Sequence, residues 1–456
     1  MKTAKFLTFF VLLGTLLFTS CDKNEATPLT IKFQKAAISM VEGDTTTLVV
    51  EGLNKGAEVA WNSSDKKIAT VKDGLVTALT PGNAIISVVA KQDGKLGHAE
   101  IKLTVTPNLD KEVIKFTDAK LQAWLLAMPG LDANKDGQIT RGEAKSINKI
   151  DFSFKNPQSV DPAKVITNID GLQYFVNLDT LNLNNHPVAN AEPIAKLTKL
   201  VQLQLYGSNF PTIDLSALTE LQDLRITRNP KLTKLDVKNN TKLVILAVAK
   251  TGITEMDLTP LKEIETVGLN DNKLTSVKFS NLPKLDRIDI FGNKLTAIEA
   301  SGCPMLKQMF ANKNAISSVV LKDMPELFNL VLYENKITQI DLNLPKLMML
   351  RLNDNAIANI DLANVPKLMI CDLFNNPLVK ADFSKNPVIR DIVLNDCPNL
   401  QEINICNKGY NPEAEYTFFY GNSQLKTIYV DKGDEETHVQ NLAKYAKRTD
   451  VKIIAQ

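Results

Sequence analysis

Apolar residues recur along more than half of the chain in one fixed pattern. Leu285, Ile288 and Ile290, followed three positions later by the polar Asn293, form one copy of it. Such a pattern predicts a stack of coils, each of which contributes one short strand to a continuous apolar core. The polar position returns every 20–22 residues, at His186, Ser208, Asn229, Thr251, Asn272, Asn293, Asn314, Asn335, Asn355, Asn376 and Cys397.

The recurring asparagine has a physical role in such a stack. A buried Asn side chain donates and accepts hydrogen bonds at once, so a column of Asn residues satisfies the backbone turns of successive coils. A coil of about 21 residues leaves little length for an outer helix, so we expect extended or 3₁₀ segments there. The pattern resembles the leucine-rich repeat family. The resemblance implies a mainly β, parallel solenoid with short or no outer helices, which we assign to residues 165–410.

Both ends of a solenoid need a cap that covers the apolar core. At the start, an imperfect copy of the pattern near residues 147–152 falls within a helical cap that we assign to residues 107–164. At the other end, we assign residues 411–456 to a C-terminal cap. It is expected to hold a last strand near residues 425–430, an amphipathic helix at residues 435–447 and a closing strand.

Residues 29–106 have a different pattern, with seven short β-rich stretches separated by turn residues. This pattern predicts an all-β sandwich. The segments at 61–65 (WNSSD), 68–71 (IATV) and 74–78 (GLVTA) resemble bacterial Ig-like domains of group 2. The resemblance implies a spacer or stalk. We interpret Trp61 as a core residue between the two sheets, which must hold together by packing alone because no pair of cysteines lies in this region.

The chain begins with two lysines and an apolar run at residues 6–18, which is too short to span a bilayer but suits a signal peptide. The run ends in FTSC, and this ending resembles the lipobox of bacterial lipoproteins. The resemblance implies a signal peptide at residues 1–20, an acylated Cys21 and a lipidated linker at residues 21–28. It also implies anchoring in the outer membrane, at the surface of a Gram-negative cell. The alternative is an ordinary secretory signal with an incidental cysteine.

The stretch at residues 132–143 resembles the calcium-binding loop of an EF-hand. A helix is predicted at residues 116–131, but Pro129 and Gly130 end it, so the resemblance is to a lone loop. We expect a structural Ca²⁺ ion with a dissociation constant of about 10⁻⁴–10⁻³ M. The alternative is a turn rich in Asp and Asn that binds no metal. The expected oxygen ligands are Asp132, Asn134, Asp136, Gln138, Thr140 and Glu143.

Composition narrows the functional classes. The chain holds 53 Lys and Arg against 51 Asp and Glu, and two of the lysines precede residue 21, so the remainder sums to zero (51 minus 51). A neutral chain lacks the basic excess that nucleic-acid binding requires. Five cysteines exclude a disulfide scaffold, although a bond between Cys397 and Cys406 stays open beside the free thiols that we expect. No motif of a serine hydrolase, zinc protease or phosphate-binding loop occurs, so we expect no enzyme.

Solenoids bind partners on the inner face of their sheet, where the strand residues between the apolar positions point outward. The position after the third apolar residue alternates between Asn and aromatic residues from Asn270 onward. This spacing separates successive aromatic rings by about 9–10 Å, or two strands. The rings are candidate interface residues, unless they merely pack against one another. The candidate partner-binding residues are Tyr206, Phe291, Phe310, Tyr333, Met349, Arg351 and Phe374.

Two functional hypotheses remain. The order of signal, Ig-like module and repeats resembles internalin-type adhesins, which implies a non-catalytic surface lipoprotein that recognises a protein or peptide. The alternative is a glycan-binding accessory lipoprotein of a polysaccharide-uptake system, because ordered aromatic side chains also stack on sugar rings. The sequence does not distinguish these two partners.

Overall fold

The computed structural model describes residues 27–154 and 160–456. The chain divides into two compact units, Met1–Glu112 and Val113–Gln456, and each has its own apolar core. The predicted signal peptide and Cys21 lie outside the described residues.

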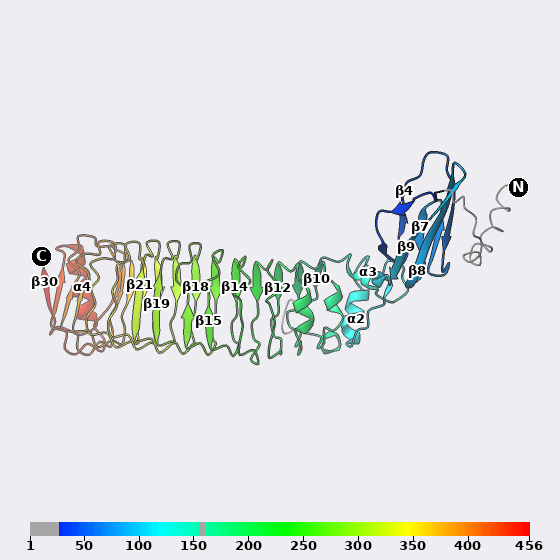
Figure 1. Cartoon of the computed structure of the whole chain (residues 1–456). Coiled ribbons are helices and arrows are strands. Elements are labelled where there is room, and N and C mark those ends of the chain that lie inside the picture. The colour runs from blue at the N-terminus through cyan, green and yellow to red at the C-terminus, as the bar shows by residue number, and fades with distance from the viewer. Residues whose placement is uncertain (1–26, 155–159) are drawn as a thin grey trace. The chain divides into compact units, whose positions relative to one another are not determined.

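The first unit is the β-sandwich that the sequence predicts (Figure 1). One sheet has the strand order β2–β9–β8–β5, the other has the order β3–β7–β6, and β1 pairs with β4. The sequence pattern missed β2, of whose five residues Met40 alone is buried. The strands are β1 (Lys32–Phe33), β2 (Ala37–Val41), β3 (Thr45–Thr47), β4 (Val50–Glu51), β5 (Glu58–Ser63), β6 (Ala69–Lys72), β7 (Leu75–Ala78), β8 (Gly82–Gln92) and β9 (Lys95–Thr106).

Trp61 packs against the core of this sandwich but is only half-buried, so it lies at the edge of the core and not within it as expected. Its ring centroid lies 5.9 Å from that of Phe33. On its other side the backbone of Gly74 comes close, with a φ of +82°, and a Cβ atom there would lie 3.2 Å from the indole. Both the left-handed backbone and the close ring favour glycine at this turn.

The second unit is a stack of coils whose strands form one 13-stranded parallel sheet (Figure 1). In each three-residue strand the middle side chain is buried and enters the core. The solenoid of parallel strands that the period predicts is confirmed. The strands in order are β10 (Lys149–Asp151), β11 (Thr180–Asn182), β12 (Gln202–Gln204), β13 (Asp223–Arg225), β14 (Ile245–Ala247), β16 (Thr266–Gly268), β18 (Arg287–Asp289), β20 (Gln308–Phe310), β22 (Asn329–Val331), β23 (Met349–Arg351), β24 (Ile370–Asp372), β26 (Asp391–Val393) and β28 (Glu415–Thr417).

The outer side of the coils holds short strands and 3₁₀ turns in place of long helices, which confirms the expectation from repeat length. The first coils carry the 3₁₀ turns η3 (Pro162–Lys164), η4 (Leu172–Tyr174) and η5 (Glu192–Lys196). Later coils pair their outer segments into small parallel sheets. These strands are β15 (Glu255–Asp257) with β17 (Ser276–Lys278), β19 (Ala297–Ser301) with β21 (Ser318–Lys322), and the series β25 (Lys380–Asp382), β27 (Glu402–Asn404), β29 (Thr427–Val430) and β30 (Lys452–Ala455).

The asparagine column makes the hydrogen bonds that we expected of it. The Asn314 amide nitrogen donates to Ile290 O at 3.1 Å in the preceding coil and to Ala311 O at 3.0 Å in its own coil. Its Oδ1 accepts the backbone N–H of Leu295 at 3.0 Å. Each such side chain therefore fastens two coils together. The same arrangement occurs at Asn293, Asn335, Asn355 and Asn376.

The N-terminal cap differs from the expectation in extent. The helix predicted at residues 116–131 spans only α2 (Ala119–Leu126), because Asp118 caps its start and the chain turns after Ala127. A second short helix, α3 (Arg141–Ala144), follows. The sheet begins with β10, which lies inside the segment that we assigned to the cap, so the repeat array starts before residue 165.

The C-terminal end also differs from the assigned boundary. The inner sheet continues to β28, past residue 410, whereas β29 belongs to the outer sheet and does not extend the inner one. The predicted amphipathic helix is α4 (Asp434–Tyr445), and the predicted closing strand is β30. The C-terminal cap therefore continues both sheets of the array, the inner sheet through β28 and the outer sheet through β29 and β30.

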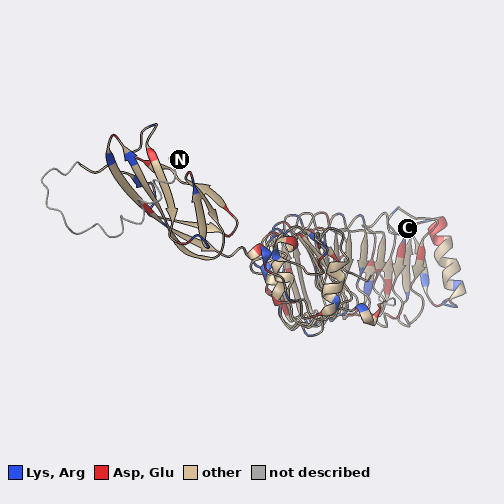
Figure 2. Ribbon diagram, turned by 90° about the vertical axis from the view of Figure 1, so that its right-hand side faces the viewer, with Lys and Arg blue, Asp and Glu red and all other residues tan. Residues whose placement is uncertain are grey.

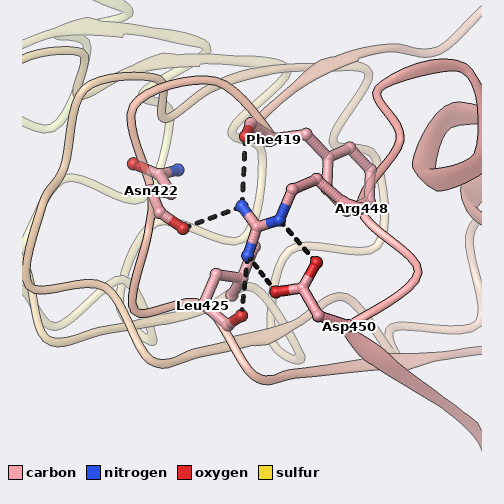
Figure 3. A network of polar contacts seen from close by, with 5 residues as sticks. All are labelled: Phe419, Asn422, Leu425, Arg448 and Asp450. Atoms are coloured by element: carbon pink, nitrogen blue, oxygen red, sulfur yellow. Dashed lines mark hydrogen bonds and ion pairs between the residues drawn. The ribbon is translucent and has the colours of Figure 1, made fainter.

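One arginine ties this cap to the last coil (Figure 3). Arg448 follows α4, and its guanidinium donates to the backbone oxygens of Phe419, Asn422 and Leu425 at 2.9–3.3 Å. It also forms a two-point ion pair with Asp450. The fork of five N–H donors suits carbonyl groups that no further coil satisfies.

Candidate partner-binding surface

Two columns of side chains point outward from each strand of the inner sheet, because the middle residue of each strand is buried. The strand register aligns these columns across neighbouring coils, for instance Asn329 with Met349 and Met349 with Ile370. A third column follows the strands and contains Phe291, Tyr333 and Phe374. The candidate residues therefore belong to one continuous face.

The predicted aromatic residues occupy this face but do not all lie together. Phe291, Tyr333 and Phe374 are half-buried and come from β18, β22 and β24, with one coil between successive rings. In the part of the chain that the structure describes, no ring pair joins them, so aromatic packing does not account for them. Tyr206 is separated from them by the coils of β13, β14 and β16, and its ring lies 5.4 Å from the Arg228 guanidinium.

Phe310 is positioned by a cation on the adjacent strand. The guanidinium of Arg287 lies 4.5 Å from the centre of the Phe310 ring. Arg287 also pairs with Asp289 and donates to Gln308 at 2.9 Å. This network fixes both the ring and the guanidinium against the sheet.

The arginines of the inner face differ in whether they have a partner. Arg225, Arg287 and Arg390 each pair with a neighbouring aspartate at 2.7–3.1 Å. The carboxylates of Asp223 and Asp391 raise the pKa of Arg225 and Arg390. Arg351 is exposed, and among the described residues no carboxylate lies within ion-pair distance of it. Arg351 is therefore free to meet a charge from outside, as is the exposed Arg228 beside Tyr206.

Sequence reasoning missed three apolar residues at the start of neighbouring strands. Phe328 and Met369 are half-buried, and Met348 is 41% exposed. Most other coils carry a polar or charged residue at the same position, such as Lys307 and Arg390. An alignment of this position across the coils would have shown that it changes from polar to apolar in three neighbouring coils.

The predicted calcium ligands form a turn with hydrogen bonds to its own backbone. The carboxylate of Asp132 accepts the N–H groups of Asp136 and Gly137 at 3.2 and 3.0 Å. Glu143 instead accepts from the backbone and hydroxyl of Thr140, in the capping box of α3. Among the described residues, no three His, Cys, Asp or Glu side chains form a group suited to a metal. To act as a metal ligand, Glu143 would have to leave this capping box.

Charges elsewhere on the coils are mixed in sign (Figure 2). Lysines pair with acids of the preceding coil, as in Lys242 with Glu220 and Lys346 with Glu326, both at 2.6 Å. Such exposed pairs neutralise the surface locally and contribute little stability, about 0–1 kcal/mol each. The described cysteines, Cys303, Cys371, Cys397 and Cys406, are free thiols.

Comparison with known proteins agrees with this architecture. Residues 27–110 match the family profile described as Bacterial Ig-like domain (group 2). The functional domain of InlJ from Listeria monocytogenes, described as including a cysteine ladder, aligns over 66% of this chain and 72% of its own, with 20% identity and a TM-score of 0.54. The chain combines a bacterial Ig-like unit with an internalin-like leucine-rich repeat solenoid. At this identity the likeness to InlJ concerns the fold.

Other solved structures align with lower scores. The internalin inlF from Listeria monocytogenes shares 20% identity over 74% of this chain and 95% of its own, with a TM-score of 0.41. YopM from Yersinia enterocolitica shares 17% identity over 59% of this chain and 62% of its own, with a TM-score of 0.43. No curated protein matches the chain in sequence. Within residues 27–154 and 160–456, no helix has the length and hydrophobicity needed to span a membrane.

Proposed function

We propose that this protein is a non-catalytic recognition protein whose inner sheet face binds a protein or peptide partner. The observation that carries the proposal is the exposed face of β18–β24. It presents aromatic rings that have no ring partners and an arginine that has no ion pair. Half-exposed aromatic side chains and an unpaired arginine are typical of residues that dominate binding energy at protein interfaces.

The alternative partner is a glycan, and the asparagines between the aromatic rings bear on it. A sugar-binding face needs free amides to bond to hydroxyl groups. The Asn270 and Asn353 amides already donate to Asp271 and Asp354 at 2.9 and 2.6 Å, and Asn312 is buried. One donor of each of these two amides is thus already used and a third amide is buried, which supports a protein partner over a glycan.

The test compares the full chain with a variant carrying Phe291→Ala, Tyr333→Ala and Phe374→Ala. Both are immobilised and exposed to surface proteins of candidate host cells and to a polysaccharide array. The proposal expects retained proteins that the triple variant loses, with unchanged unfolding midpoints. Retention of glycans alone, or equal protein capture by both forms, would contradict it. Met305→Ala is the matched control, because Met305 is 48% exposed in a turn outside the inner sheet.

We also propose that Cys21 is acylated and anchors the protein in the outer membrane, with the Ig-like unit as a spacer. Metabolic labelling with a radioactive fatty acid tests the anchor. Label on the wild type and none on Cys21→Ser is the expected result. Protease treatment of intact cells tests which side the protein faces. Full protection of the chain would contradict surface exposure.

We further propose that the loop at residues 132–143 binds a structural Ca²⁺ ion. The turn around Asp132 supports this, because hydrogen bonds within it hold the oxygen-bearing side chains of Asp132, Asn134 and Asp136 in one loop, and Ca²⁺ prefers oxygen ligands. Calorimetric titration should give a dissociation constant of about 10⁻⁴–10⁻³ M and a raised unfolding temperature. Asp132→Asn with Glu143→Gln should abolish both, whereas Asp341→Asn, an exposed acid of the array, should keep them. If the wild type shows no heat of binding and no thermal shift, the calcium proposal is rejected.

A further inference from the structure

Three neighbouring coils replace polar residues with large apolar ones at the start of their strands. The backbone N–H of Met348 donates to Phe328 O, and that of Met369 donates to Met348 O, both at 2.9 Å. These residues are thus direct neighbours across β22, β23 and β24. Lys307 and Arg390 occupy the same position in the coils on either side, so the apolar column has charged ends.

The first outward position of β23 and β24 is apolar as well. Met349 pairs in register with Ile370, and both are half-buried. On the neighbouring strand β22, Asn329 and Val331 point to this face yet are only 9% and 5% exposed. The Oδ1 atom of Asn329 is buried without a hydrogen-bond partner among the described residues. We call Phe328, Met348, Met349, Met369 and Ile370 the methionine patch.

A methionine patch of this kind suits an apolar peptide. Methionine side chains are unbranched and polarizable, so they adapt to different apolar shapes. Met348 is exposed and the other four residues of the patch are half-buried, and contiguous apolar side chains at a protein surface mark interaction sites. The face is an open set of strands, and the hollow of about 450 Å³ lies elsewhere, on the outer strands β15 and β17. An open face favours a peptide segment over a small ligand that needs enclosure.

The positive charge of Arg351, beside the methionine patch, indicates that the partner carries an acidic group. Arg351 follows Met349 by two residues on β23, so both side chains point to the same face. Its neighbour in register, Asp372, accepts the Phe374 N–H at 3.2 Å, and burial raises the pKa of this carboxyl against smaller lowering effects of that N–H and of the Arg351 charge. Asp372 attracts Arg351 but, among the described residues, makes no hydrogen bond or ion pair with it, so the Arg351 guanidinium keeps its donors for a partner.

We infer that the methionine patch and Arg351 form the docking site, and that its occupant is an apolar peptide segment of a protein that carries one carboxylate. The apolar side chains of the segment cover the methionines, and its carboxylate meets the guanidinium in a two-point pair. This inference rests on the proposed function, and it narrows the partner to one chemical class and the site to three coils.

The test uses a random peptide library displayed on phage and selected on the full chain. Enriched peptides should combine Leu, Ile, Met, Phe or Trp with an Asp or Glu. A synthetic fluorescent copy of the best peptide is then titrated against variants. Arg351→Glu should weaken binding by about tenfold or more, and replacing the peptide's acid with Lys should restore it. Met349→Ser with Met369→Ser should weaken binding of both peptides.

Matched variants separate this site from the rest of the face. Arg225→Glu reverses a charge on the same sheet outside the patch, and Met305→Ser removes an exposed methionine elsewhere, so neither should change affinity. No enriched peptide, equal losses in Arg225→Glu and Arg351→Glu, or displacement of the peptide by equimolar dodecanoate would each overturn the inference. Protein capture that depends on Phe291 and Phe374 but not on Arg351 would keep the proposed function and reject this site alone.

Discussion

Asn314 and Asn229 occupy the same position of the repeat but differ in what they bond. Asn314 donates to three carbonyl groups and accepts one N–H, whereas both amide atoms of Asn229 are buried with no partner among the described residues. Its neighbours in the column, Ser208 and Thr251, are shorter side chains than asparagine. The column is therefore interrupted near β13.

This difference predicts opposite outcomes for the same substitution. Asn314→Leu leaves the Leu295 N–H unpaired and removes one of the two amides that bond Ile290 O and Ala311 O, so it should lower the free energy of unfolding by about 1–3 kcal/mol. Asn229→Leu removes unpaired polar atoms and should be neutral or stabilising by up to about 1 kcal/mol. Chemical denaturation of both variants measures this. Similar losses for the two would contradict the assigned hydrogen bonds.

His186 opens the column and predicts a pH dependence. Its Nε2–H donates to Phe152 O at 2.7 Å, and its Nδ1 accepts the Ile166 N–H at 3.0 Å, so the ring is neutral. Burial lowers its pKa, against smaller opposing effects of Phe152 and Asp118. The unfolded chain then takes up a proton near pH 6.5 that the folded chain refuses, so stability falls as pH drops below that value.

The test of this residue compares the wild type with His186→Asn, which restores the usual residue of the column. The wild type should lose on the order of 1 kcal/mol more than the variant between pH 7.5 and pH 5.5. His438, whose pKa burial also lowers, is present in both forms and cancels. Parallel stability curves would reject the neutral buried imidazole.

The outer segments show what ends a strand in this fold. Asp257 and Asp382 close β15 and β25, because each side chain accepts the N–H two residues onward, from Thr259 and Ser384 at 2.9 Å. The equivalent positions of β19 and β21 hold Glu299 and Val320, and these strands continue to five residues. The sequence period predicted the coils but not these pairings, which depend on one side chain per coil.

At the C-terminal end, Arg448 bonds the carbonyl groups of the last coil. Replacing it should lower the stability of the C-terminal cap. Arg448→Lys keeps the charge but loses the fork of donors that bonds three carbonyl oxygens. The α4–β30 region should become less stable by about 2 kcal/mol, seen as faster amide exchange in β29 and β30. Arg225→Lys, which weakens the two-point ion pair with Asp223 at an exposed site, should change exchange little. Unchanged protection in Arg448→Lys would show that the cap does not depend on this residue.

At the scale of the whole molecule, the sequence predicted the features that recur at a regular spacing. It missed the features that become visible only when equivalent positions of neighbouring coils are compared. The 20–22-residue period was sufficient to predict the parallel solenoid, and alternation was sufficient for the sandwich. The candidate rings Phe291, Tyr333 and Phe374 were found because their spacing is regular. Phe328, Met348 and Met369 were missed because their position is polar or charged in most other coils. Whether Arg351 had an ion-pair partner required side-chain geometry.

The most direct test of the account is a photocrosslinking measurement on the full chain. A benzophenone amino acid replaces Tyr333 on the inner face in one form and Met305 in a turn outside the sheet in another. With the surface proteins that the wild type retains, the account predicts a specific crosslinked partner from position 333 and none from position 305. A partner captured from position 305 but not from 333 would contradict recognition by the inner face.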